Sequence, residues 1–249
     1  MSVQSPERDT SRDAFFDRYA STFYARPEEA ALASIFRTYD HNLHDLLPAS
    51  RTARIIDVGC GAGVLLRFVK SKGYTNVVGW ELSKDQVEAC HRAGLTEVRK
   101  VDDTRLELLA APKQFDMVLM TDVLEHVQKP EILPLLEAIR GSLAPGGIAV
   151  FRVPNLASFT GAYSRYHDFT HEVGFVEKSL AQVLKIAGFE QVQVRAERHA
   201  FRSPIKGALF LGAQSMMRLV RRACMFLEVP GSDLPHAFSA NIIGIGRVP

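Results

Sequence analysis

The chain has few cysteines, and their spacing follows no known framework. Its 249 residues contain only Cys60, Cys90 and Cys224, an odd number without a Cys-x-x-Cys pair. This argues against a disulfide framework and against a cysteine-based zinc site. We therefore expect a reducing, cytoplasmic location.

Long apolar runs and a strong excess of one charge are also missing. No uninterrupted apolar stretch is long enough to span a bilayer, and the polar residues 1–13 do not resemble a signal peptide. The net charge of +2 gives no electrostatic basis for nucleic-acid binding. No sequence period recurs, which excludes a repeat architecture. The length and the 47% of hydrophobic residues suit one globular α/β domain with additions.

A glycine-rich stretch near residue 60 is the most informative local pattern. Residues 55–58 are mostly apolar, partly β-branched, and predict a short buried strand. Gly59, Gly61 and Gly63 follow at every second position, and an apolar helical pattern begins after them. Glycine tolerates positive φ and leaves room for a ligand, so this turn can present backbone N–H groups to a bound molecule.

The glycine spacing and a nearby acid decide between two nucleotide-like ligands. Dinucleotide sites use Gly-x-Gly-x-x-Gly and bind a pyrophosphate, which an adjacent carboxylate disfavours. Here the spacing is Gly-x-Gly-x-Gly, and Asp57 lies two residues before the first glycine. S-adenosylmethionine carries a sulfonium and an ammonium but no phosphate, so it suits this acidic strand end.

With Asp57 and these glycines, the chain resembles the class I S-adenosylmethionine-dependent methyltransferases. The resemblance extends through a strand ending at Glu81, a Phe-Asp-x-Val strand at 115–118, Asp-Val-Leu-Glu-His at 122–126 and Leu-x-Pro-Gly-Gly at 143–147. It covers residues 50–195 most clearly. It implies an α/β fold with a doubly wound, Rossmann-like sheet of seven strands, in which the last strand is antiparallel and helices cover both faces.

The resemblance also assigns the cofactor contacts. Glu81 lies 20 positions after Gly61 and corresponds to the acid that binds the ribose hydroxyls. An acid after the third strand commonly binds the adenine amino group; we favour Asp103, although it or its neighbour Asp102 could instead cap a helix. Cys60 is expected to contribute only its small size. The predicted cofactor-binding residues are Asp57, Gly59, Cys60, Gly61, Gly63, Glu81, Leu82, Asp103, Thr104, Thr121 and Asp122.

A polar and aromatic segment, residues 154–172, follows the fifth predicted strand. A loop of this length inside a compact domain usually serves a function, and it should overhang the same sheet edge as Asp122. A hydroxyl nucleophile benefits from a general base, and histidine is the usual one. We take His171 as the favoured base. The competing catalytic candidates are His126, Asp168 and His167, and the predicted acceptor contacts are Arg165, Tyr166 and Asn155.

Glu125 and His126 have a second interpretation. Their side chains could serve only to fix the loop by hydrogen bonding. They could also begin a divalent-metal site, but two ligands without a third visible partner make a poor case. We therefore predict no metal.

Two motifs in the segment resemble a bacterial branch of the family that is associated with polysaccharide and O-antigen biosynthesis. They are the Pro-Asn-x-x-Ser start and the Arg-Tyr-x-Asp-x-Thr-His-Glu core, although that branch usually has glycine in place of His167. This implies O-methylation of a saccharide or glycolipid hydroxyl. The alternatives are O-methylation of a phenolic or quinone-precursor small molecule, and a non-catalytic cofactor-binding module. A nucleic-acid base amine is disfavoured because the fourth strand lacks an Asn-Pro-Pro-Tyr-like ending.

The remaining segments complete the predicted domain organisation. Residues 1–13 are expected to form a disordered tail and residues 14–49 an N-terminal helical cap, in which Tyr19 and Tyr24 could cover the cofactor. The methyltransferase domain should occupy residues 50–249, with a helical insert at about 200–230. Its helix, residues 205–228, has basic and apolar sides. We expect a lid, a subunit interface or peripheral contact with an anionic membrane there. The sequence does not predict the oligomeric state.

Overall fold

The computed structural model describes residues 29–231 and 233–249. The predicted tail, residues 14–28 of the predicted cap, and with them Tyr19 and Tyr24, lie outside these ranges. The described part of the cap forms one helix, α3, over Glu29–Leu43.

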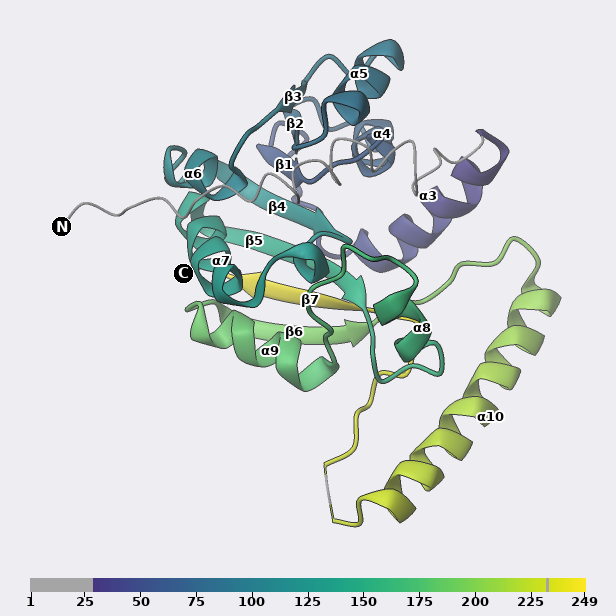
Figure 1. Ribbon diagram of the computed structural model, residues 1–249. Coiled ribbons are helices and arrows are strands. Elements are labelled where there is room, and N and C mark those ends of the chain that lie inside the picture. Colours follow the sequence, from purple (N-terminus) through teal and green to yellow (C-terminus); the bar gives the residue numbers. More distant parts are fainter. Residues whose placement is uncertain (1–28, 232) are drawn as a thin grey trace.

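Helices and strands alternate along most of the described chain (Figure 1). The further helices are α4 (Val64–Ser71), α5 (Lys84–Arg92), α6 (Thr104–Leu109), α7 (Ile132–Ser142), α8 (Gly161–Tyr166), α9 (Glu177–Ile186) and α10 (Pro204–Glu228), with short 3-10 turns η1 (Leu124–His126) and η2 (Lys129–Glu131). The strands are β1 (Ile55–Val58), β2 (Val77–Glu81), β3 (Val98–Lys100), β4 (Phe115–Thr121), β5 (Leu143–Pro154), β6 (Glu190–Ala196) and β7 (Asn241–Arg247).

The seven strands form one sheet in the order β3-β2-β1-β4-β5-β7-β6. β1 pairs in parallel with both β2 and β4, so the strand order reverses direction between β1 and β4. β7 is antiparallel to both of its neighbours, β5 and β6. This confirms the predicted doubly wound sheet with its last strand reversed. In such sheets ligands bind beyond the carboxyl ends of the strands, next to the reversal.

Alternating side chains of the strands divide the core between the two faces of the sheet. Ile56 of β1 and Val118 of β4 belong to a buried cluster with α6, α7 and α9, whereas Ile55 and Met117 belong to a second cluster with α4 and α5. This follows from the period of two in a strand. The rings of Phe36 and Tyr39 in α3 pack on Phe68 of α4, with centroids 5.7 Å and 5.5 Å away.

The sequence predicts a long loop after β5. In the structure a short helix, α8, forms within this segment, so less of it is irregular. The backbone N–H groups of Glu172 and Val173 donate to the carbonyl oxygen of Glu125, at 2.8 Å and 3.1 Å. These bonds join the end of the segment to η1, which follows β4. The segment, residues 155–176, is called the β5 loop below, and its position next to the end of β4 agrees with the expectation from sequence.

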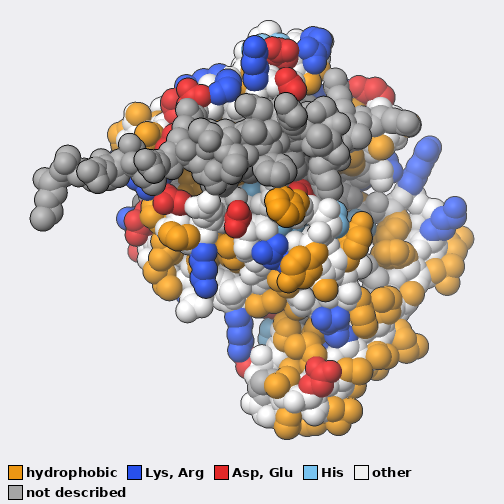
Figure 2. All heavy atoms as spheres, in the orientation of Figure 1, with side chains coloured by type: hydrophobic (Ala, Val, Ile, Leu, Met, Phe, Trp, Pro, Cys, Tyr) orange, Lys and Arg blue, Asp and Glu red, His pale blue; other side chains and the backbone are white. Residues whose placement is uncertain are grey.

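α10 is the predicted insert helix, and it projects from the body of the domain (Figure 1). Its exposed apolar side chains include Ile205, Leu209, Met216, Leu219, Phe226 and Leu227. Hydrophobic side chains crowd the lower part of the surface in Figure 2, where this helix lies. Across the described ranges, neither α10 nor any other helix has the apolar length that crossing a bilayer requires.

Candidate active site

The glycine turn connects β1 to α4 at the carboxyl edge of the sheet. The N–H groups of Gly59 and Cys60 donate to the carbonyl oxygen of Trp80 on β2, at 2.8 Å and 3.1 Å, and the N–H of Gly63 donates to the carbonyl oxygen of Cys60 at 2.9 Å. The φ angles of Gly59, Gly61 and Gly63 are 70°, 52° and 73°. All three lie in the left-handed region that side chains disfavour, which explains the alternating glycines.

These glycines differ in what surrounds them. A Cβ atom at Gly59 would lie 2.4 Å from Val123, and one at Gly63 would lie 2.3 Å from Leu95, whereas a Cβ at Gly61 would meet no atom within 4 Å. Glycine at positions 59 and 63 therefore leaves room for the side chains of Val123 and Leu95. Gly61 faces open space, and its backbone is the part of the turn that a ligand can approach.

Two carboxylates flank the turn. Asp57 is 2% exposed, its Oδ2 has no hydrogen-bond partner among the described residues, and burial followed by the charge of Glu81 raises the pKa of Asp57 to about 8. Glu81 is half-buried and accepts hydrogen bonds from the N–H groups of Gly61 and Ser83, at 2.8 Å and 2.9 Å. Burial raises the pKa of Glu81, against these backbone bonds. A carboxylate accepts about four hydrogen bonds, so Glu81 keeps lone pairs for further donors.

Asp103, which was predicted to bind the adenine amino group, has a structural role in this conformation. The Asp103 carboxylate accepts a hydrogen bond from the N–H of Leu106 at 3.0 Å and so caps α6, the helix-capping alternative that the sequence left open. Thr104 is the first residue of α6, and Leu82 is exposed directly after Glu81. Asp102 pairs with Lys100 at 2.5 Å.

Cys60 points away from the open side of the turn. Its side chain is buried within the core cluster of α4 and α5, and a Cβ at Gly79 of β2 would lie 2.8 Å from its sulfur. Interaction with Cys90, followed by burial, raises the pKa of the Cys60 thiol, so the sulfur is protonated. Only the backbone of Cys60 lies where it can serve a ligand, in line with the small-size role expected for it.

The end of β4 lies beside the glycine turn and carries an ionic network. Asp122 has a φ of 55°, and its carboxylate pairs with Arg152 of β5. Arg152 also pairs with Glu197, with 2.6 Å between Nε and Oε1. Thr121, the neighbour of Asp122, lines a small hollow with Tyr39 and Arg152. Arg152 and Glu197 were not among the predicted site residues. They are far from Asp122 in the sequence, and no motif around them indicates that they pair at the end of β4.

A cluster of one carboxylate and two imidazoles lies just beyond Asp122. One potential ligand atom from each of Glu125, His126 and His171 lies within 4.8 Å of the others, and all three residues are buried. The rings of His126 and His171 are 4.7 Å apart. Neither carboxylate oxygen of Glu125 has a hydrogen-bond partner among the described residues, and burial, then the charge of Asp122, raises the pKa of Glu125.

Hydrogen bonds determine which ring nitrogens of the two histidines carry protons. The Thr170 hydroxyl lies 2.7 Å from Oδ1 of Asp168, to which it donates, and 2.8 Å from Nδ1 of His126. Since the hydroxyl proton is used on Asp168, Nδ1 of His126 donates to the hydroxyl oxygen. Nδ1 of His171 lies 2.7 Å from the Ser164 carbonyl oxygen, which only accepts. Nδ1 is therefore a donor in both rings, and a neutral ring in this arrangement has its lone pair on Nε2.

The other catalytic candidates have different positions. Asp168 is buried. Its Oδ1 accepts hydrogen bonds from the hydroxyl and from the backbone N–H of Thr170, at 2.7 Å and 2.9 Å, and so orients Thr170. His167 is exposed and stacks on Tyr163, with centroids 5.0 Å apart. Burial, more than the neighbouring charges, lowers the pKa of His171, so its imidazole is neutral near pH 7. Of the four candidates, the structure brings the three histidines together, with the His171 ring centroid 4.7 Å from that of His126 and 5.5 Å from that of His167. Oδ2 of Asp168 lies 3.9 Å from Nε2 of His171.

Two of the three predicted acceptor contacts instead hold the β5 loop. The Asn155 side chain is fully buried, donates to the carbonyl oxygens of Ala237 and Ser239 and accepts from the N–H of Ala157. Because its polar groups are occupied by the backbone, the prediction that Asn155 contacts the acceptor is corrected. The Arg165 guanidinium donates to the carbonyl oxygens of His171 and Glu172, at 2.6 Å and 3.1 Å. Tyr166 is 79% exposed and stays a candidate.

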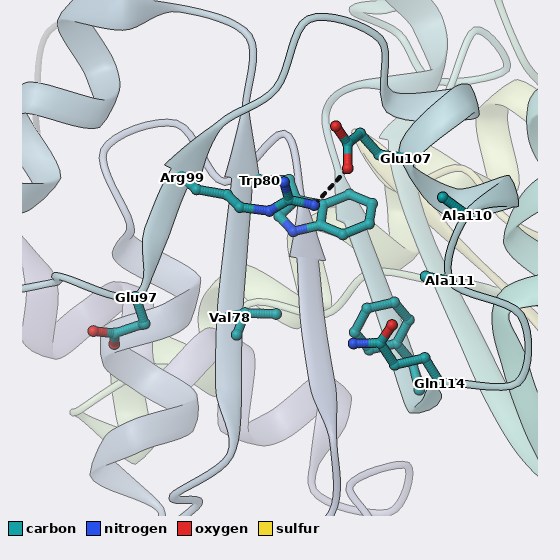
Figure 3. A pocket seen from close by; sticks show the side chains of 9 residues that line it. Val78, Trp80, Glu97, Arg99, Glu107, Ala110, Ala111 and Gln114 are labelled. Atoms are coloured by element: carbon teal, nitrogen blue, oxygen red, sulfur yellow. Dashed lines mark hydrogen bonds and ion pairs between the residues drawn. The ribbon is translucent and has the colours of Figure 1, made fainter.

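Another hollow lies away from these residues. A cavity of about 360 Å³ lies between β2, β3 and α6, away from the glycine turn. In it the Arg99 guanidinium lies 4.5 Å from the Trp80 ring centroid and pairs with Glu107 at 2.7 Å (Figure 3). This pairing fills one side of the cavity, and none of the predicted site residues lines it.

Comparison with known proteins agrees with the sheet and the turn. Residues 31–194 match a family described as "Methyltransferase domain". Relatives named ubiquinone biosynthesis O-methyltransferase include one from Psychrobacter cryohalolentis, 32% identical over 108 residues, which cover 41% of each chain. Another, from Neisseria meningitidis, is 28% identical over 170 residues, covering 62% of this chain and 66% of the relative. The chain thus spans about two fifths of the length of the first of these curated relatives.

Solved structures share the fold at low sequence identity. A methyltransferase from Archaeoglobus fulgidus, described as SAM-dependent, has a TM-score of 0.63 and 19% identity, with 86% of this chain and 93% of that chain covered. Phosphoethanolamine N-methyltransferase 2 of Haemonchus contortus, in complex with S-adenosyl-L-methionine, has a TM-score of 0.60 and 16% identity, with 94% and 60% covered. The family match spans more than half of the residues, and on that basis this chain belongs to the methyltransferase-domain family.

Proposed function

We propose that this protein uses S-adenosylmethionine to methylate a phenolic hydroxyl of a quinone precursor. The observation that carries the proposal is the family match together with relatives named for O-methylation in ubiquinone biosynthesis. The saccharide acceptor expected from the β5 loop motifs has no counterpart in the names of these relatives. The phenolic alternative is therefore the better supported of the two.

The residues at the glycine turn fit this cofactor. The buried Oδ2 of Asp57 has no partner among the described residues, as a site for a cationic ligand requires. Gly61 is open on its Cα side, and Glu81 has lone pairs beyond those used by Gly61 and Ser83. We assign the charged end of the cofactor to the side of Asp57 and the ribose hydroxyls to Glu81.

The protein's contribution to the reaction is mainly one of position. When bound, S-adenosylmethionine supplies a methyl group on a sulfonium, and methyl transfer leaves the neutral thioether. The residues of the chain must hold an acceptor oxygen in line with that methyl group and accommodate the hydroxyl proton it loses. The cluster of Glu125, His126 and His171 follows the end of β4, and β4 pairs with β1, the strand that precedes the glycine turn. Both of its imidazoles donate through Nδ1, which leaves Nε2 as the nitrogen that can take up a proton.

Exposed aromatic side chains of the β5 loop support an aromatic acceptor. Tyr163, Tyr166 and Phe169 are 70%, 79% and 84% exposed, on the segment that also supplies His171. Aromatic rings offer a planar apolar contact for a phenol or a quinone ring. A saccharide acceptor would instead require many hydrogen-bonding groups, and Asn155 and Arg165 are occupied by backbone carbonyl groups.

The experiment measures transfer of a labelled methyl group from S-adenosylmethionine to two acceptor panels, one of dihydroxylated aromatic acids and alkylated catechols, the other of nucleotide sugars and glycolipids. We expect turnover with the aromatic panel and none with the sugars. Turnover confined to the sugars would restore the original expectation. If calorimetry shows no binding of S-adenosylmethionine or S-adenosylhomocysteine, the whole proposal fails.

A further inference from the structure

We infer that Glu125, His126 and His171 bind a divalent metal ion at the acceptor side of the site. The sequence argument against a metal was the absence of a third ligand, and the fold supplies one from the β5 loop, because potential ligand atoms of the three residues lie within 4.8 Å of one another. One carboxylate and two imidazoles form a common three-residue set of catalytic metal sites, in which further coordination positions stay open.

Glu125 gives an independent reason for a cation. The residue is 2% exposed, and neither of its carboxylate oxygens has a hydrogen-bond partner among the described residues. A buried ionised carboxylate without compensation costs several kcal/mol, so such a group takes up a proton, pairs with a cation or coordinates a metal. The charge of Arg152 acts on Glu125, but its guanidinium forms ion pairs with Asp122 and Glu197.

The histidines are prepared in the manner of metal ligands. Each donates its Nδ1 proton to an oxygen, His126 to the Thr170 hydroxyl and His171 to the Ser164 carbonyl, which leaves Nε2 as the nitrogen that can bind a metal. Nε2 of His171 lies 3.9 Å from Oδ2 of Asp168. The Thr170 hydroxyl is in turn held by Asp168 at 2.7 Å. Metal-binding histidines almost always have such an oxygen partner on the other nitrogen, which fixes the tautomer and the ring orientation. Thr170 and Asp168 are thus positioning residues.

The chemistry of the ligands points to a class of ion. Imidazole nitrogens suit zinc, iron, copper and nickel, and a carboxylate suits manganese, whereas magnesium and calcium prefer oxygen ligands alone. A cation at this place would bind the acceptor oxygens and lower the pKa of a bound hydroxyl, so that its proton leaves to solvent before the oxygen takes the methyl group. This role rests on the proposed function, whereas metal binding itself does not. His171 then acts as a ligand, not as the general base.

The test is titration of the full chain, freed of metal with a chelator, with Mn²⁺, Zn²⁺ and Co²⁺ by calorimetry, together with the absorption spectrum of the Co²⁺ form. We expect one equivalent per chain and a Co²⁺ spectrum with imidazole ligation. Glu125→Gln and His171→Ala should each weaken binding about 100-fold, and Thr170→Val, which removes only the hydroxyl, about 10-fold. His41→Ala is the control, because His41 is an exposed histidine of α3 that lies outside the cluster, and it should bind as the wild type does.

Two results would overturn the inference. One is wild-type protein that binds S-adenosylhomocysteine but none of the three ions at up to millimolar concentration, which leaves the proposed function standing. The other is unchanged affinity in both ligand variants, with their fold checked by circular dichroism and by S-adenosylhomocysteine binding. Should either variant not fold, the wild-type Co²⁺ spectrum decides: a spectrum of water and carboxylate ligands alone counts against the site.

Discussion

The glycine turn and the Glu125 cluster lie at the ends of neighbouring strands, β1 and β4, but they are built in different ways. The turn is held mainly by bonds of its own backbone, such as that from the N–H of Gly63 to the carbonyl oxygen of Cys60. The cluster is held by side chains of two segments, and the bond between His126 and Thr170 spans 44 residues. A local motif can specify the first region completely, whereas the second exists only after the chain has folded.

The first prediction concerns the segment that carries the cluster. Asn155→Ala leaves the buried carbonyl groups of Ala237 and Ser239 and the N–H of Ala157 without their partner. At ~1–3 kcal/mol for each unsatisfied buried group, partly relieved by relaxation, the free energy of unfolding should fall by about 3 kcal/mol. Urea unfolding measures it, with Tyr166→Ala as the exposed control from the same loop. A stable Asn155→Ala protein with a raised KM for the acceptor would return Asn155 to substrate binding.

The second prediction separates strain in the turn from its role in binding. Gly61 and Gly73 both have positive φ, 52° and 88°, and a Cβ at either would meet no atom within 4 Å. Alanine at either position should therefore destabilise the fold to a similar extent, ~1–2 kcal/mol. Only Gly61→Ala places a methyl group where the cofactor approaches, so its Kd for S-adenosylhomocysteine should rise about 100-fold.

Calorimetry on the two alanine variants, beside the wild type, makes this comparison. Gly73 lies after α4, away from the turn, so Gly73→Ala should bind with the wild-type Kd. Equal loss of affinity in both variants would mean that general destabilisation, and not contact with the ligand, accounts for the effect at Gly61.

This contrast also explains how much the sequence could predict. The sheet, its reversed last strand and the positions of Asp57, Glu81 and the glycines follow from strand periodicity and from motifs whose parts are close in the chain. The partnership of Glu125 with His171, and the occupation of Asn155 by backbone groups before β7, depend on how the β5 loop folds back. No spacing rule in the sequence encodes that path. Asp103 shows the intermediate case, since an acid after a strand can serve a ligand or a helix end.

The third prediction concerns the pH dependence of stability at the turn. Burial raises the pKa of Asp57 to about 8, above its value of about 3.9 in an unfolded chain. The folded chain therefore binds a proton that the unfolded chain has lost between about pH 4 and pH 8, and the stability of the ligand-free protein falls as pH rises through that window, by up to ~1.4 kcal/mol per unit.

Asp57→Asn should remove this contribution, so that the variant gains stability over the wild type as pH rises from 5 to 8 while it loses affinity for the cationic cofactor. Urea unfolding of both proteins across that range gives the slope. Parallel stability curves for the two proteins would show that the pKa of Asp57 is not raised in the folded chain, which would contradict this prediction.

The smallest expected effect lies outside both regions, on α10. We propose that this helix contacts anionic membrane surfaces, since its basic residues Lys206, Arg218, Arg221 and Arg222 accompany exposed apolar side chains without an acid before Glu228. Each basic residue near such a surface contributes about 1 kcal/mol, so Arg222→Gln should lower partitioning to vesicles containing phosphatidylserine about fivefold. Arg92→Gln on α5 makes the same charge change at an exposed residue away from α10 and should leave it unchanged. Equal binding to neutral and anionic vesicles would mean that the basic residues do not contribute. No binding to either at low salt would leave α10 as a lid or a subunit contact, and its apolar side chains would then have to be covered by protein.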